Sequence, residues 1–136
     1  MTDHVDPSKR SSIMAAVHAK DTAPEMAVRR IVHALGYRYR LHSAQLPGKP
    51  DLVFVSRRKI VFVHGCFWHR HSMCKYATIP KTRRDFWMEK FSRNAERDRK
   101  VRLELKHLGW KVLTVWQCEL KKPEKLTERL IEFLED

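Results

Sequence analysis

The chain has 136 residues, a length that predicts one domain with a single hydrophobic core and no need for disulfide bonds. Lysine and arginine number 28 against 16 acidic residues, which gives a formal charge of +12 and a pI near 10.0. This balance favours nucleic acid as a partner over a merely basic soluble surface, and the absence of a signal peptide or long apolar run predicts a cytoplasmic protein with no membrane partner.

The N-terminal half predicts helices and then short strands. Residues 8–20 carry apolar side chains at helical spacing, and a second helix is expected from Thr22, a capping residue, to Leu35, ending at Gly36. Strands are then predicted at 37–41, 52–55 and 60–63, with the last two forming a hairpin.

The C-terminal half continues the mixture of helices and strands. A loop over 64–81 precedes a long helix, predicted to start at Thr82 with Asp85 completing the cap and to end at Gly109. A strand over 110–116 and a helix opened by Pro123 follow. The order of elements predicts a mixed α/β single domain over residues 1–136.

The cysteines suggest a metal site. The chain has an odd number of them, three, which argues against a disulfide framework in a cytoplasmic protein. Cys66, His71 and Cys74 lie on one loop, and Cys118 follows the predicted strand that ends at Trp116. Zinc in structural sites takes four thiolate or imidazole ligands, so this set fits a Cys₃His site. Spacing alone weighs equally for zinc and for buried, metal-free cysteines.

Two further histidines, His64 and His69, are left outside that set. If the hairpin turn centres between Arg57 and Arg58, Asp51 faces His64 at one end of the sheet. The simpler alternative is that Asp51 follows Pro50 in a turn, where aspartate is common, and the residues alone favour this alternative.

Asp98 lies in the apolar stripe of the long helix, seven residues from both Phe91 and Leu105. An isolated buried carboxylate is costly, so Asp98 requires a partner. A structural bond to an arginine and an active-site role explain this position equally well.

Aromatic residues surround the candidate metal ligands. Phe67 and Trp68 are adjacent on the loop, and Trp87 lies near the start of the long helix. Packing in the core is the usual fate of such residues. On a basic protein, exposed apolar side chains can also wedge between DNA bases, and Met14 on the first helix is a similar candidate.

Several longer motifs occur in a fixed order along nearly the whole chain. They are Arg10-Ser11 with Met14, Asp21-Thr22-Ala23 with Glu25, Leu46-Pro47-Gly48 with Pro50-Asp51, His64-Gly65-Cys66-Phe67-Trp68-His69, Phe86-Trp87 with Glu89-Lys90, Asn94 with Glu96-Arg97-Asp98-Arg99, and Leu108-Gly109-Trp110 with Val115-Trp116. With these motifs the sequence resembles the very short patch repair (Vsr) DNA mismatch endonucleases.

The resemblance implies a restriction-endonuclease-like α/β domain with a mixed central sheet flanked by helices and a structural zinc site. It also implies magnesium-dependent nicking of one DNA strand beside the thymine of a T:G mismatch, the product of 5-methylcytosine deamination, which initiates very short patch repair. Double-stranded mismatched DNA is then the substrate and mismatch-repair proteins are candidate partners. A monomer associated with the nucleoid is expected, with residues 1–20 as a DNA-contacting arm.

The resemblance also assigns roles to residues by position. Asp51 and the carbonyl of Val63 would bind magnesium, with two catalytic ions expected at the site. The remaining roles are His69 as general base, His64 and Asp98 orienting metal-bound water, Glu25 supporting the site, Cys66, His71, Cys74 and Cys118 binding zinc, and Phe67, Trp68, Trp87 and Met14 intercalating into DNA.

The sequence departs from one common nuclease motif, a gap that the resemblance implies for this family with histidines in its place, and two competing functions share its features. Many restriction-like nucleases carry Asp…Glu-x-Lys, but the second hairpin strand reads Val61-Phe62-Val63 and supplies neither residue. A non-catalytic, zinc-stabilised DNA-binding module would use the same basic surface and wedges, and a related nuclease acting on U:G mismatches or unmodified sites would share the same motifs.

Overall fold

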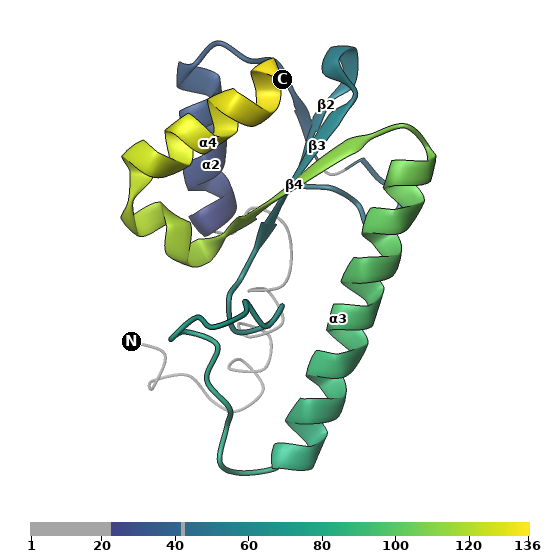
Figure 1. Cartoon of the computed structure of the whole chain (residues 1–136), viewed down its shortest axis with the longest axis vertical. Coiled ribbons are helices and arrows are strands. Elements are labelled where there is room, and N and C mark those ends of the chain that lie inside the picture. Colours follow the sequence, from purple (N-terminus) through teal and green to yellow (C-terminus); the bar gives the residue numbers. More distant parts are fainter. Residues whose placement is uncertain (1–22, 42) are drawn as a thin grey trace, which may run out of the picture.

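The computed structural model describes residues 23–41 and 43–136 (Figure 1). The expected N-terminal arm, with Met14 and the capping residue Thr22, lies outside the described residues. The elements in chain order are α2 (Ala23–Ala34), β1 (Arg40–Leu41), β2 (Leu52–Phe54), the 3₁₀ turn η2 (Val55–Arg57), β3 (Lys59–His64), α3 (Arg84–His107), β4 (Lys111–Trp116), the 3₁₀ turn η3 (Gln117–Lys121) and α4 (Pro123–Glu135).

The strands form one mixed sheet in the order β1-β2-β3-β4. The pairs β1/β2 and β2/β3 are antiparallel, whereas β3 and β4 run parallel over six residue pairs, from Lys59 with Lys111 to His64 with Trp116. The parallel pair is joined by the long crossover that contains α3, as a parallel connection requires. His64 and Trp116 therefore end neighbouring strands at the same edge of the sheet.

The predicted hairpin exists, but its predicted register is wrong. Leu52 pairs with Val61, so continuation of the ladder does not place Asp51 opposite His64. In the structure β2 ends at Phe54 and passes directly into η2, and Arg58, with φ of 56°, returns the chain to β3 in the left-handed conformation, so Phe54 pairs with Lys59. The difference is two residues, which preserves the face on which each side chain lies.

The sheet buries apolar side chains on both faces, and these strands are accordingly apolar without strict alternation. One face packs against α2 and α4 through Val28, Val32, Leu52, Phe54, Val61, Val115, Leu126, Leu130 and Leu134. The other face packs against the C-terminal part of α3 through Val53, Ile60, Phe62, Leu105 and Trp110. Figure 1 shows α2 and α4 together on one side of the strands and α3 on the other.

Helix α3 differs from its prediction at its start. It begins at Arg84 rather than Thr82, and its cap residue Arg83 makes no side-chain capping bond. Its N-terminal half extends beyond the sheet and runs beside the loop that follows β3 (Figure 1), so only Phe91 and Leu105 of its apolar stripe are buried. This extension places Asp98 beside that loop instead of in the core. No helix among residues 23–41 and 43–136 is long and apolar enough to cross a membrane.

Candidate active site and metal centre

Two carboxylates lie together where α2 meets the start of β2. Glu25, in the first turn of α2, is only 2% exposed and forms an ion pair with Arg29 one turn later. Asp51 immediately precedes β2, and its Oδ2 accepts a hydrogen bond from the backbone N–H of Val63 at 2.6 Å. Asp51 is thus fixed against the end of β3 by a backbone contact rather than by the cross-strand pairing predicted from the sequence.

The pKa of Asp51 is raised from 3.8 to about 7, mainly by burial and also by the nearby Glu25 carboxylate, against the lowering effect of the Val63 hydrogen bond. Arg29 is the cation beside these two carboxylates, so the pair carries excess negative charge when both are ionised. Hard divalent cations prefer carboxylate oxygens, which Asp51 and Glu25 supply here. The donor set therefore fits a magnesium ion.

A second cluster joins the end of β3 to α3. His69 Nδ1 donates to Asp98 Oδ2 at 2.7 Å, and the rings of His64 and His69 stack with centroids 3.8 Å apart and planes 8° from parallel. The carboxylate bond assigns the proton of neutral His69 to Nδ1 and leaves Nε2 as a proton acceptor. Asp98 therefore has a histidine partner, which decides against the arginine bond considered from the sequence.

His64 is 7% exposed, and its burial, together with the adjacent His69, lowers its pKa from 6.5 to about 3. His64 is therefore neutral near pH 7 in the absence of a ligand. A neutral imidazole in this place can donate or accept one hydrogen bond without adding charge beside a phosphate.

The four predicted zinc ligands converge. The ligand atoms of Cys66, His71, Cys74 and Cys118 all lie within 4.8 Å of one another. His71 Nδ1 is 3.7 Å from Cys66 Sγ and 3.4 Å from Cys118 Sγ. A tetrahedral zinc with Zn–S of about 2.3 Å and Zn–N of about 2.0 Å has ligand–ligand distances of roughly 3.5–3.8 Å. The residues therefore fit a closed, structural zinc site.

Trp116 separates the zinc cluster from the histidine pair. Its ring stacks on His71, with centroids 4.3 Å apart and planes at 10°, and meets His64 edge-on at 5.5 Å. The backbone N–H of Cys118 also donates to Cys66 Sγ at 3.4 Å. Burial raises the pKa of the metal-free Cys66 thiol to about 12, so binding of zinc would release a proton from this residue.

The loop aromatics form a half-buried cluster against the N-terminal half of α3. Phe67 contacts Trp68, Trp87 and Phe91 at centroid distances of 5.0, 5.8 and 5.2 Å, and Trp68 lies 5.6 Å from Trp87. Only Phe91 is fully buried. The three predicted intercalating residues of this region are therefore neighbours, supported from beneath by one core aromatic.

Arg70 holds this loop together, although it was not among the site residues predicted from the sequence. Its guanidinium donates to the carbonyls of Phe67 (3.1 Å), Ala77 (2.8 Å) and Thr78 (2.9 Å), and lies 4.1 Å from the centre of the Phe91 ring. Asn94 adds a second tie, since its Nδ2 donates to the Trp68 carbonyl at 3.2 Å. Arg70 thus ties Phe67 to residues 77–78 within the loop, and the contacts with Phe91 and Asn94 tie the loop to α3; the sequence pattern indicates neither, because both depend on how the loop folds.

Comparison with known proteins identifies the chain. A family described as DNA mismatch endonuclease Vsr matches residues 2–75. The DNA mismatch endonuclease Vsr of Escherichia coli (strain K12) is 44% identical, over 100% of this chain and 87% of that protein. The type II nicking enzyme V.XorIIP of Xanthomonas oryzae pv. oryzae is 47% identical, over 99% of this chain and 98% of that enzyme.

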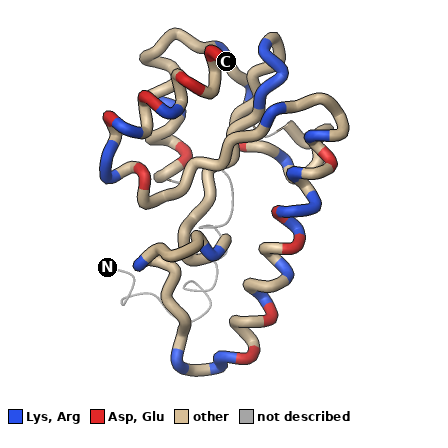
Figure 2. Tube along the Cα trace, in the orientation of Figure 1, with Lys and Arg blue, Asp and Glu red and all other residues tan. Residues whose placement is uncertain are grey.

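The chain belongs to the Vsr family. It is a DNA endonuclease, as the sequence predicted. The catalytic domain of the homing endonuclease I-Bth0305I has a similar fold, with a TM-score of 0.59 over 83% of this chain and 94% of that domain at 18% identity. This similarity supports the predicted restriction-endonuclease-like fold. Figure 2 shows lysines and arginines spread over α3, α4 and the β2–β3 turn of this Vsr-family chain, as a DNA-binding protein requires.

Proposed function

We propose that this Vsr-family enzyme is a magnesium-dependent endonuclease that nicks one strand of duplex DNA next to the thymine of a T:G mismatch. The observation that supports the proposal lies at the end of β3, where the Val63 amide holds Asp51 and the next residue, His64, stacks on His69, which is bonded to Asp98. On this proposal the enzyme acts as a single-domain monomer on nucleoid DNA in the cytoplasm, and the nick initiates very short patch repair alongside other mismatch-repair proteins.

Asp51 and the Val63 carbonyl, supported by Glu25, would hold magnesium. Magnesium bound there would neutralise charge on the scissile phosphate and activate the attacking water. His69 accepts the proton of that water at Nε2, because its Nδ1–H is already donated to Asp98. Asp98 orients the imidazole and stabilises it once protonated. His64 stacks on His69 and limits its rotation.

Substrate selection follows from the aromatic cluster. Phe67, Trp68 and Trp87 would enter the base stack from one groove, and Met14 from the other. Unstacking costs less at a mispaired step, so the mismatch favours insertion before any base is recognised. Zinc on Cys66, His71, Cys74 and Cys118 would fix the loop that carries both His69 and the wedge.

Asp51→Ala tests the catalytic part of this proposal. We expect nicking of a T:G duplex in magnesium to fall by at least about 10³-fold, because the metal loses its principal carboxylate, with binding affinity kept within a few-fold. Asp85→Ala is the matched control, since Asp85 is an exposed aspartate in the first turn of α3. Nicking by Asp51→Ala at the rate of Asp85→Ala would contradict the proposal.

A further inference from the structure

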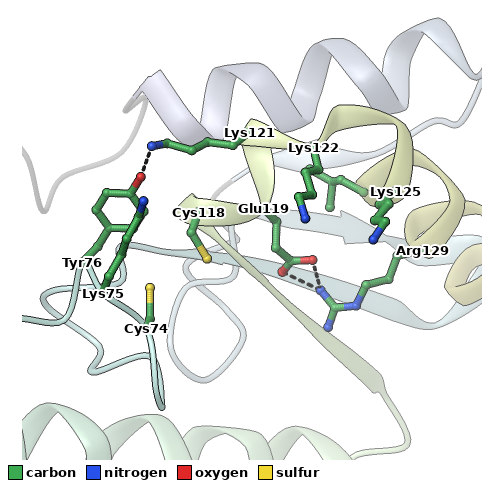
Figure 3. A pocket seen from close by; sticks show the side chains of 10 residues that line it. Cys74, Lys75, Tyr76, Cys118, Glu119, Lys121, Lys122, Lys125 and Arg129 are labelled. Carbon is green, nitrogen blue, oxygen red and sulfur yellow. Dashed lines mark hydrogen bonds and ion pairs between the residues drawn. The ribbon is translucent and has the colours of Figure 1, made fainter.

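A basic cavity lies beside the zinc ligands and outside the catalytic cluster. It has a volume of about 530 Å³ and is bordered by the loop around Cys74, by η3 and by the start of α4 (Figure 3). Its charged lining consists of Lys75, Lys121, Lys122, Lys125, Arg129 and Glu119. Five cationic side chains thus face one carboxylate.

Internal contacts account for only part of this charge. Arg129 Nη1 donates to both oxygens of Glu119, at 2.6 and 2.7 Å, and Lys121 donates to the hydroxyl of Tyr76. Within the described part of the chain, the ammonium groups of Lys122 and Lys125 form no hydrogen bond or ion pair. Two exposed ammonium groups beside an already neutralised Glu119 leave a surplus of positive charge in the cavity.

The position of the cavity indicates what this charge meets. Strands β3 and β4 are parallel and end at the paired residues His64 and Trp116. The catalytic cluster follows the end of β3, and the cavity follows the end of β4, so both open at the same edge of the sheet. Trp116 lies between the catalytic cluster and the zinc ligands that border the cavity: its ring centroid is 5.5 Å from that of His64 and 4.3 Å from that of the zinc ligand His71.

We propose that this cavity binds phosphodiester groups of the DNA duplex flanking the scissile bond, with Lys122 and Lys125 as the contacting residues. The inference rests on the proposed function, because it assumes that DNA occupies the catalytic edge. Phosphates recur about every 3.4 Å along a strand, so a duplex seated there presents several phosphates to the neighbouring strand end. An acidic protein segment would also match the charge, but nothing requires it to lie at the catalytic edge.

The test is the salt dependence of DNA binding. Dissociation constants of wild-type protein, Lys122→Gln, Lys125→Gln and the double variant are measured without magnesium on one T:G duplex, from about 50 to about 200 mM KCl. Each lost phosphate contact should reduce the slope of log K against log[salt] by about 1. The slope of the double variant should be smaller in magnitude by about 2. The ratio of its dissociation constant to that of wild type should therefore narrow about tenfold as KCl rises over this range.

Lys106→Gln is the matched control. It removes one exposed charge from the last turn of α3, at the opposite end of the sheet from the cavity, and should leave the slope unchanged. Thermal unfolding of every variant checks that the fold is retained. If the folded double variant has the same slope of log K against log[salt] as wild type, the inference is overturned. That result is also the one expected if the cavity binds an acidic peptide instead of DNA. Failure of the wild type to nick the T:G duplex in magnesium would overturn the proposed function separately, whatever the slopes are.

Discussion

Replacing Arg70 with alanine should release the loop that carries the aromatic cluster. The guanidinium forms two half-buried hydrogen bonds, to the Phe67 and Ala77 carbonyls, and a third, more exposed bond to the Thr78 carbonyl. At about 1 kcal/mol for each half-buried bond and about 0.5–1 kcal/mol for the contact with the Phe91 ring, the closed loop loses about 2.5–3 kcal/mol. That loss corresponds to roughly a 70- to 160-fold increase in the open population.

Hydrogen exchange of the loop amides over residues 66–78 measures this opening, and nicking of a T:G duplex measures its consequence. The control is Arg83→Ala. Both arginines have positive φ, 53° and 54°, so alanine meets the same backbone strain at each. Among residues 23–41 and 43–136 the Arg83 guanidinium forms no hydrogen bond or ion pair and lies over the Phe86 ring, 4.4 Å from its centre, so its loss should have little effect. Equal exchange rates in Arg70→Ala and Arg83→Ala would refute the reasoning.

Three other predictions concern charge and metal. Because the pKa of Asp51 is raised from 3.8 to about 7, the folded state binds this proton more tightly than the unfolded chain, and Asp51 makes magnesium-free protein less stable as pH rises from about 4 to about 7. His64, whose pKa is lowered to about 3, acts in the opposite direction. Asp51→Asn should therefore gain stability relative to wild type at about pH 8 but not at about pH 4, and equal gains at both would contradict this. Lys59 is 4% exposed and donates to the main-chain oxygens of Phe133, Leu134 and Asp136. Lys59→Met should therefore lower the free energy of unfolding by about 2 kcal/mol in a denaturant titration. Lys111→Met, which loses one exposed ion pair, should cost less than about 0.5 kcal/mol in the same titration. Cys118→Ser should reduce bound zinc from about one equivalent to less than about half, while Met73→Ala, which removes a fully exposed sulfur from the same loop, should retain it.

The sequence predicted those features that depend on local pattern. Helix α4 begins at Pro123 as expected, because proline suits the first helical turn, and the apolar strands around Leu52 and Val61 form the predicted hairpin. The start of α3 was predicted wrongly, because a residue in the left-handed conformation, Arg83, supplies the entry instead of a side-chain cap at Thr82.

Within the site, the four cysteine and histidine ligands could be collected from spacing and strand ends, and the structure brings them together. Partnerships between distant segments could not. The bond between His69 and Asp98 depends on α3 extending past the sheet, and the contact of Asp51 with the Val63 amide depends on a hairpin register set by one left-handed residue, Arg58. Such contacts are decided by tertiary geometry, which no local pattern contains.

The most direct test of the proposed function is to map cleavage on end-labelled duplexes that differ at one base pair. Wild-type protein with magnesium should cut only the thymine-containing strand of a T:G duplex, beside that thymine, and should leave the matched T:A duplex intact. Cleavage of both strands, or equal cleavage of T:G and T:A duplexes, would contradict the account.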